Sequence, residues 1–160
     1  MHKTRNSLPD NTRKAMIELL QGSLADGVDL QTQVKQAHWN VKGPDFIGLH
    51  ELFDEVHSLV EIQVDSIAER LVTLGGVAEG TARAAAERSR LPEYPRQIAD
   101  GRAHVEALAD VLARFCTTCR EAIESADEAG DPITADLYTA IARELDKQVW
   151  FIEAHVQAER

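Results

Sequence analysis

Apolar residues recur every three or four positions along most of this chain, which is the spacing of helices that bury one face. The pattern predicts four long helices, over residues 10–38, 45–74, 96 to about 126, and 132–156. Pro9 suits the start of the first helix, Gly75 and Gly76 end the second, and Pro132 fits the first turn of the fourth. No segment alternates apolar and polar residues as a strand does, so we expect an all-α protein.

A long connection separates the second and third predicted helices, between Gly76 and Pro95. It is too long for a simple turn and contains the alanine-rich stretch TARAAAERS, which predicts a short extra helix that crosses the bundle. We therefore expect one domain over residues 1–160, a four-helix bundle with a short helix in the connection and a short N-terminal tail over residues 1–9.

The charge of the chain is negative but unevenly distributed. The formal net charge of −10 at pH 7 argues against a uniformly basic surface that would bind nucleic acid. Residues 1–14 are the exception, since they carry four basic side chains and one acidic side chain. No apolar run reaches the roughly 18 residues that a membrane span requires, and the first residues lack the hydrophobic stretch of a secretion signal, so we expect a cytoplasmic protein.

Two cysteines, Cys116 and Cys119, lie three residues apart in the third predicted helix. This spacing suits two small buried side chains better than a disulfide framework. A zinc site would need two further ligands, and the sequence has no second cysteine pair to supply them.

Residues 50–69, HELFDEVHSLVEIQVDSIAE, place four potential metal ligands in the second predicted helix: His50, Asp54, Asp65 and Glu69. At 100° per residue they point at about 0°, 40°, 60° and 100°, so they share one stripe of the helix. Asp54 and Asp65 are nevertheless eleven residues apart, which is about 16.5 Å along the axis, whereas ligands lie within roughly 2.0–2.5 Å of a metal. The stripe therefore contains two half-sites that one chain cannot bring together.

A second copy of the helix, lying antiparallel across a two-fold axis, would bring each upper half-site against a lower one. Each of the two sites would then take His50 and Asp54 from one subunit and Asp65 and Glu69 from the other. His38, one short turn before the second helix, can join the His50 end. Imidazoles with carboxylates suit iron and leave positions open for an oxidant, although zinc and manganese are also compatible. The alternative is that these residues form only the solvated face of a helix.

Residues 35–76, KQAHWNVKGPDFIGLHELFDEVHSLVEIQVDSIAERLVTLGG, strongly resemble the signature region of the Dps family, the miniferritin branch of the ferritin-like superfamily. The matching features are AHWN, the two half-site motifs and the spacing between them. The stretch DPITADLYTAIARELDKQVWFIEAHV resembles the last helix of the family, so the resemblance covers nearly the whole chain. It implies a ferritin-like four-helix subunit with a short helix in the connection, assembled from two-fold dimers as a hollow homododecamer.

The resemblance also implies a ferroxidase site between subunits. Carried over position by position, the metal ligands are His38, His50 and Asp54 of one subunit with Asp65 and Glu69 of its two-fold mate. Lys35 and Trp39 match family positions beside this site. Their alternative roles are a surface ion-pair partner for the lysine and an interface aromatic for the tryptophan.

The implied activity is the oxidation of Fe(II), preferentially by hydrogen peroxide and otherwise by oxygen, with storage of the ferric mineral inside the cage. Removing iron and peroxide together would protect DNA and the cell from oxidative damage. Zinc could substitute for iron at the same ligands.

Iron must also enter a closed cage, and the family uses acidic pores at one class of three-fold axis. Four acidic residues fall in the corresponding segment: Asp127, Glu128, Asp131 and Asp136. A ring of such carboxylates would concentrate cations at the pore. The alternatives are a helix cap for Asp131 and a solvated turn for Asp127 and Glu128.

DNA binding in the family is attributed to a lysine-rich N-terminal extension. In that region this chain offers only Lys3, Arg5, Arg13 and Lys14. Twelve copies on one cage could turn weak contacts into salt-sensitive binding and association with the nucleoid, whereas a solvated tail beside an acidic surface would not bind. Both interpretations stay open at this point.

Two rival functions are compatible with the same residues. One is a structural, nucleoid-associated cage whose metal site is weak or holds zinc. The other is a ferritin-type protein with a di-iron centre inside each bundle, which would require Glu-x-x-His pairs on two helices. The chain contains no Glu-x-x-His, and the nearest pattern, Asp54 with His57, has no counterpart in the last helix.

Overall fold

The computed structural model describes residues 1–158, so the last two residues of the predicted domain lie outside it. The helices are α1 (Asp10–Asn40), α2 (Phe46–Thr73), α3 (Ala82–Arg88), α4 (Gly101–Glu128) and α5 (Pro132–Gln157). Within the described residues there is no strand, only an isolated backbone bridge between Lys42 and Asp100. The predicted all-α class, with four long helices and a short fifth in the connection, is confirmed.

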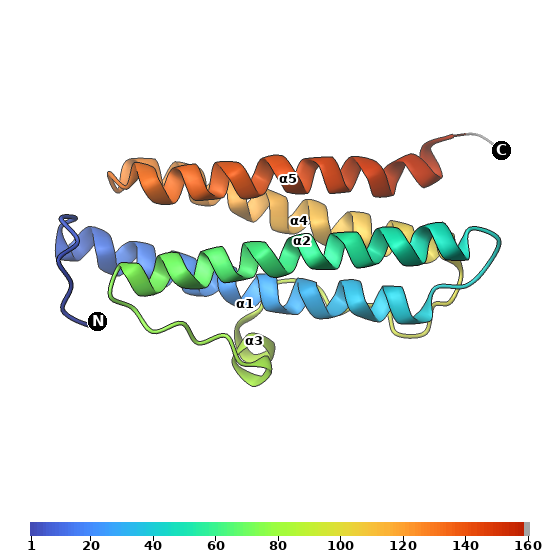
Figure 1. The fold of residues 1–160 in the computed structure, drawn as a ribbon, viewed down its shortest axis with the longest axis horizontal. Helices are drawn as coiled ribbons and strands as arrows, with labels where there is room; N and C mark the ends of the chain where they lie inside the picture. Colours follow the sequence, from blue (N-terminus) through green and yellow to red (C-terminus); the bar gives the residue numbers. More distant parts are fainter. Residues whose placement is uncertain (159–160) are drawn as a thin grey trace.

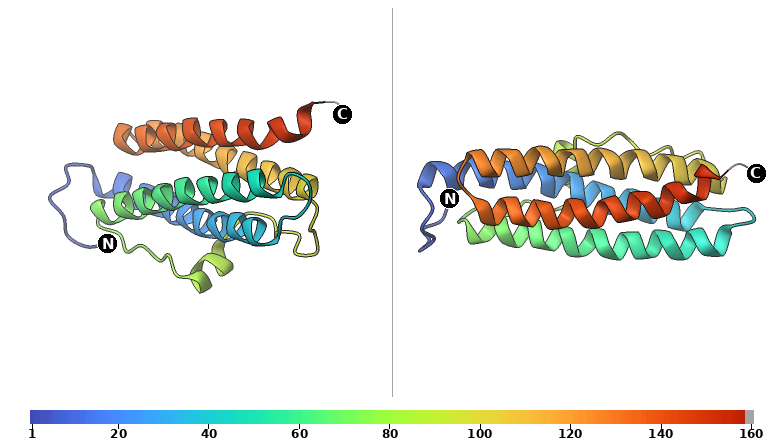
Figure 2. Two further views of the ribbon diagram at one scale, coloured as in Figure 1. Left: turned by 45° about the vertical axis from the view of Figure 1, so that its right-hand side comes forward. Right: turned by 90° about the horizontal axis from the view of Figure 1, so that it is seen from above.

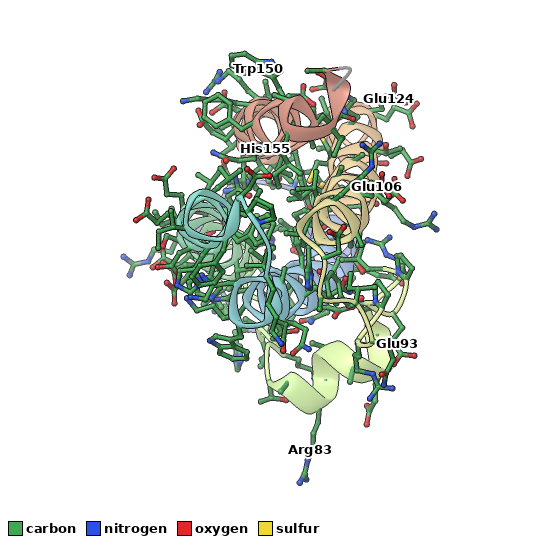
Figure 3. All side chains as sticks on the ribbon, turned by 90° about the vertical axis from the view of Figure 1, so that its right-hand side faces the viewer. Arg83, Glu93, Glu106, Glu124, Trp150 and His155 are labelled. Carbon is green, nitrogen blue, oxygen red and sulfur yellow. The ribbon has the colours of Figure 1, made fainter. Side chains whose placement is uncertain are left out.

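The four long helices form the bundle, and α3 lies outside it. α1 packs along α2, and α4 packs along α5, with the two pairs lying one over the other (Figures 1 and 2). In the view along the bundle, α1, α2, α4 and α5 surround the core, whereas α3 lies beyond α1 and its Arg83 points away from the molecule (Figure 3). α3 and its connection therefore cover part of the outside of α1, whereas α2 keeps a row of exposed side chains.

The core is one continuous apolar cluster contributed by all four long helices. Burying a leucine or phenylalanine side chain contributes roughly 1.5–3 kcal/mol, so this cluster is the main source of stability. The apolar phase predicted for the second helix is confirmed, because the following α2 residues are all at most 3% exposed: Leu49, Phe53, Val56, Val60, Ile67 and Leu71.

Two helix boundaries lie where the sequence predicted them, because each is set by neighbouring residues. α2 stops before Gly75, which has φ of +94°, a left-handed conformation that glycine adopts without strain. α5 begins after Asp131, whose carboxylate accepts a hydrogen bond from the Thr134 backbone N–H at 3.1 Å. Pro132 then occupies the first turn, where its missing N–H is not needed.

The predicted start of the third long helix, near residue 96, is wrong by about one turn, because α4 begins at Gly101. The residues just before α4 are held outside the helix, since the backbone N–H of Lys42 donates to the carbonyl of Ala99 at 2.9 Å. Asp100 then caps α4 by accepting from the Ala103 N–H at 3.1 Å. Gly101 lies so close to the α1–α2 pair that a Cβ would be 2.8 Å from Leu49 Cδ1, so a larger residue cannot occupy this position without displacement.

The long connection is fixed to α1 by buried polar contacts. Asp26 has no exposed surface, and its carboxylate accepts hydrogen bonds from the Arg90 backbone N–H at 2.7 Å and from the Arg90 guanidinium at 2.6 and 3.0 Å. The Ser89 hydroxyl donates to Asp29 at 2.6 Å. These contacts determine where the connection crosses the outside of α1.

A second buried contact joins this connection to α4. The Tyr94 hydroxyl and His104 Nδ1 are hydrogen-bonded at 2.6 Å, and His104 is only 1% exposed. Burial lowers the pKa of His104 below the ordinary value for histidine, and it raises the pKa of Tyr94. Both side chains are therefore neutral in the folded protein at neutral pH.

Acidification should weaken the fold through His104. Because its pKa is lower in the folded than in the unfolded chain, the associated stability is complete above about pH 6.5 and is lost as the pH falls below that value. We expect the free energy of unfolding to decrease between pH 7.5 and pH 5.5, and to decrease less in His104→Gln. Denaturant titration of both proteins at both pH values measures this, and an equal decrease in the two proteins would contradict the assignment to His104.

No helix within residues 1–158 combines the length and the apolar character needed to cross a lipid bilayer.

Candidate metal centre

One unbroken helix, α2, carries the four ligands predicted from residues 50–69. His50 and Asp54 are partly exposed, and Asp65 and Glu69 are exposed. Among residues 1–158, no three histidine, cysteine or acidic side chains lie close enough to hold one metal ion. The separation into two half-sites, inferred from the helical rise, therefore also holds in the folded subunit.

His38 and His50 form the most organised part of the centre. Their rings stack with centroids 3.7 Å apart and planes inclined by 22°. His38 Nδ1 lies 2.8 Å from the backbone carbonyl oxygen of His50, and His50 Nδ1 lies 2.9 Å from the carbonyl oxygen of His38. The turn between α1 and α2 thus brings the two histidines into a reciprocal contact.

This reciprocity determines the tautomer of both rings. A carbonyl oxygen can only accept a hydrogen bond, so each Nδ1 must carry the hydrogen and donate it. In the neutral form of either ring the lone pair is then on Nε2, the atom available to a metal. Metal-binding histidines commonly have this arrangement, in which a backbone carbonyl fixes the ring and increases its basicity as a ligand. The two carbonyl oxygens could not be assigned to the centre from the sequence, because every residue has a backbone carbonyl.

Asp54 completes this half-site together with Lys35. The Lys35 ammonium forms an ion pair with the Asp54 carboxylate, and half of the Asp54 side chain remains exposed. The hydrogen bond from Lys35 holds the pKa of Asp54 below its usual range. The carboxylate is thus deprotonated before any metal arrives. The Lys35 ammonium occupies part of the space in which a metal would be coordinated. The ion pair expected as one of two roles for Lys35 is present.

The remaining predicted residues are more loosely placed. Trp39 follows His38 but is 67% exposed, so within one subunit it has little packing. Phe46, by contrast, lies against the centre, with its ring centroid 5.2 Å from that of His50.

The cysteines of the third predicted helix are both buried and unbridged, as expected from their spacing.

Comparison with known proteins identifies the family. Residues 17–160 match the model of the ferritin-like domain. The chain is 47% identical over 156 residues to a DNA protection during starvation protein (Dps) of Agrobacterium fabrum, and the alignment covers 98% of this chain and 96% of that protein. This chain belongs to the Dps family.

Solved Dps structures have the same subunit fold. The tetragonal form of Mycobacterium smegmatis Dps is 35% identical and superposes with a TM-score of 0.93, covering 98% of this chain and 95% of the other. The Dps protein of Vibrio cholerae O1, described as a member of a broad superfamily of ferritin-like diiron-carboxylate proteins, is 25% identical with a TM-score of 0.91 over 98% of each chain.

The expectation that Asp131 lines a Dps-type pore is wrong, because its carboxylate is completely buried and fully used within the subunit. The Arg70 guanidinium donates to both of its oxygens at 2.8 Å, and the Thr134 hydroxyl donates to it at 2.5 Å. Burial alone would raise the pKa of Asp131, but the hydrogen bonds from Thr134 and Arg70 hold it below its ordinary value. The helix-cap alternative is correct for this residue, whereas Asp127, Glu128 and Asp136 are exposed.

One of the four N-terminal cations predicted to contact DNA, Arg13, is buried in this Dps chain. Arg13 is only 6% exposed, and its guanidinium donates to the Leu74 carbonyl at 3.0 Å and to Asp10. It stabilises the end of α2 and is not accessible to DNA. The tail contacts the same end, where the His2 backbone N–H donates to the Gly75 carbonyl at 2.6 Å. The exposed cations of the segment are Lys3, Arg5 and Lys14.

Proposed function

We propose that this protein is a ferroxidase and iron store that oxidises Fe(II), preferentially with hydrogen peroxide, at sites shared between two subunits. The observation that carries the proposal is the histidine pair. Two stacked imidazoles with both Nε2 atoms free lie beside an ionised carboxylate, whereas the complementary carboxylates lie on the same helix at a distance that one chain cannot close. Such a half-site has a clear use only when a second copy completes it.

The relatives support the iron chemistry. The Vibrio cholerae relative is described as a ferritin-like diiron-carboxylate protein, and the Agrobacterium fabrum relative is named for protecting DNA during starvation. Two imidazoles with three carboxylates form the mixed nitrogen and oxygen set that suits iron. We therefore extend iron oxidation, iron storage and protection from oxidative damage to this chain.

The surface of α2 supports an antiparallel contact between two copies. His50 pairs with Glu69, and Asp54 pairs with Asp65, about one common midpoint that falls between residues 59 and 60. Two exposed apolar residues, Ile47 and Val72, are 62% and 52% exposed and lie symmetrically about the same midpoint.

The helical rotation strengthens this match. At 100° per residue, Ile47 and Val72 point at about 60° and 40° relative to His50, inside the arc of the ligands. A two-fold axis through the midpoint would therefore bury Ile47 of one subunit against Val72 of the other at the outer end of each metal site. The metal ligands and the apolar contacts specify the same register.

Within such a site, the protein's residues hold two Fe(II) ions close to one oxidant molecule. While the site holds no iron, the Lys35 ammonium neutralises the Asp54 carboxylate. An arriving Fe(II) ion then replaces the ammonium at this carboxylate. Two Fe(II) ions then give one electron each to hydrogen peroxide, which takes up two protons and leaves as two water molecules. A single iron would instead split peroxide into hydroxide and a hydroxyl radical, so pairing is what protects the cell.

The same proposal includes a homododecameric cage built from these dimers, with Fe(II) entering where Asp127, Glu128 and Asp136 gather at a three-fold axis. Exposed carboxylates at the turn between α4 and α5 support an acidic entrance. Lys3, Arg5 and Lys14, repeated on every subunit, would supply any DNA contact, and this contact would be weak and salt-sensitive.

Titration of anaerobic, Fe(II)-loaded protein with hydrogen peroxide tests this function. We expect two Fe(II) ions to be oxidised per peroxide molecule, much faster than in protein-free buffer, with almost no hydroxyl radical captured by a spin trap. Protein preloaded with zinc serves as the control and should oxidise iron slowly. Oxidation no faster than in buffer would favour the rival structural cage, and one Fe(II) per peroxide with abundant radical would exclude a paired site.

A further inference from the structure

Cys116 is part of a polar cluster between α4 and α5 that the iron chemistry does not use. Its Sγ lies 3.1 Å from Asp146 Oδ1 on α5 and 3.0 Å from Arg120 Nη1, one turn along its own helix. Arg120 Nη2 lies 2.6 Å from both carboxylate oxygens of Asp146. The cysteine is 1% exposed, whereas the arginine and aspartate side chains are 52% and 53% exposed, so these two side chains separate the sulfur from solvent.

The two charged neighbours act on the thiol in opposite directions. A guanidinium beside a cysteine stabilises the thiolate, which is the form that reacts with peroxide. A carboxylate accepts a hydrogen bond from the S–H group and repels a negative sulfur. The Ala142 carbonyl oxygen, 3.6 Å away, is a second acceptor for the same S–H.

The balance favours the thiol. Burial first and Asp146 second raise the pKa of Cys116 to about 11, against the opposing effect of Arg120. Burial also raises the pKa of Cys119, which lies deeper in the bundle. Cys116 is in direct contact with an exposed charged pair, Arg120 and Asp146, which a single surface substitution can unbalance.

We propose that Asp146, paired with Arg120, keeps Cys116 as an unreactive thiol, and that Cys116 is a latent oxidation site for hydrogen peroxide which loss of this one carboxylate exposes. In the latent reaction, the thiolate sulfur attacks one peroxide oxygen and the O–O bond breaks. The sulfur is oxidised to a sulfenic acid, and the other oxygen leaves as hydroxide. The proposal does not depend on the ferroxidase site, but it gives a reason why a protein that meets peroxide can keep a cysteine beside an arginine.

Asp146→Asn tests this directly, because the substitution removes the charge, preserves the shape and leaves Arg120 in place. Metal-free parent and variant are exposed to hydrogen peroxide at pH 7.5, trapped with a sulfenic-acid reagent and analysed by peptide mass mapping. We expect Cys116 of the variant to be labelled at least about 10-fold faster than that of the parent. Arg120→Gln combined with Asp146→Asn should return the rate towards that of the parent, and Cys119 should stay unlabelled throughout.

A second measurement needs no substitution. The rate of iodoacetamide alkylation of Cys116 in the parent should remain low through neutral pH and rise only in strongly alkaline solution. Rapid labelling of the parent by peroxide, or alkylation that already saturates near pH 8, would overturn the proposal. So would a folded Asp146→Asn protein whose Cys116 is no more reactive than that of the parent.

Discussion

Replacing His50 and Asp54 together by alanine should slow peroxide-driven Fe(II) oxidation by at least about 100-fold, equivalent to about 2.7 kcal/mol of transition-state stabilisation. The substitutions remove the His50 imidazole, whose Nε2 is oriented for a metal, and the Asp54 carboxylate, which Lys35 holds ionised. The remaining ligands cannot keep two irons together. Asp65→Ala with Glu69→Ala should cause a loss of the same size, because it removes the other half of the same site. Stopped-flow absorbance of the ferric product measures the initial rates.

The matched control for these pairs is Glu106→Ala with Asp110→Ala. These two acidic residues have the same four-residue spacing and lie exposed on α4, but they have no place in the proposed site. The control protein should oxidise iron at nearly the parent rate. If either ligand pair can be removed from an assembled protein without loss of rate, the assigned ligands are wrong.

Ile47→Lys should disrupt the dimer, and adding Val72→Glu should restore it. In the proposed register, a lysine at position 47 is buried against the apolar Val72 of the partner, and the two-fold axis repeats this contact. An unpaired buried charge costs several kcal/mol, which is enough to dissociate an interface of ordinary stability. The second substitution places a carboxylate opposite the lysine in both copies of the contact. Sedimentation velocity distinguishes the dissociated subunit from the restored assembly.

A mismatched pair provides the control for this charge exchange. Ile62 is as exposed as Ile47, but it is not related to position 47 by the midpoint of α2. Ile47→Lys with Ile62→Glu should therefore stay dissociated. Restoration by the mismatched pair, or failure of the matched pair, would mean that α2 meets its partner in another register, and the proposed pairing of His50 and Asp54 with Asp65 and Glu69 would then be wrong as well.

Features encoded by neighbouring residues were the ones that sequence could predict. The apolar spacing of α2 and the glycines after it define that helix, and the Asp131–Pro132 pair defines the start of α5. The stripe of metal ligands follows from the same periodicity. Helical rise alone separates the two half-sites on one chain, and the absence of a three-ligand cluster within residues 1–158 agrees with this separation. Completion of each site by a second subunit stays a prediction.

Features that depend on distant contacts could not be predicted in this way. Ile98 continues the apolar spacing of α4, but the hydrogen bond from the Lys42 backbone N–H to the Ala99 carbonyl holds this segment outside the helix. From sequence alone, Arg13 looks like an exposed cation of the tail. In the structure its guanidinium is bound to the Leu74 carbonyl at the end of α2. The reciprocal bonds of His38 and His50 involve carbonyl oxygens, and they exist only because the turn between α1 and α2 faces the two residues towards each other.

The most direct test of a site shared between subunits is to mix the two inactive ligand variants. His50→Ala/Asp54→Ala and Asp65→Ala/Glu69→Ala are co-expressed with different tags, and the doubly tagged assemblies are purified and assayed for Fe(II) oxidation. Random pairing makes half of the dimers mixed, and each mixed dimer has one complete site out of two, so about one quarter of the parent activity should return. Activity that stays at the level of the separate variants would contradict a centre completed by a second copy of α2.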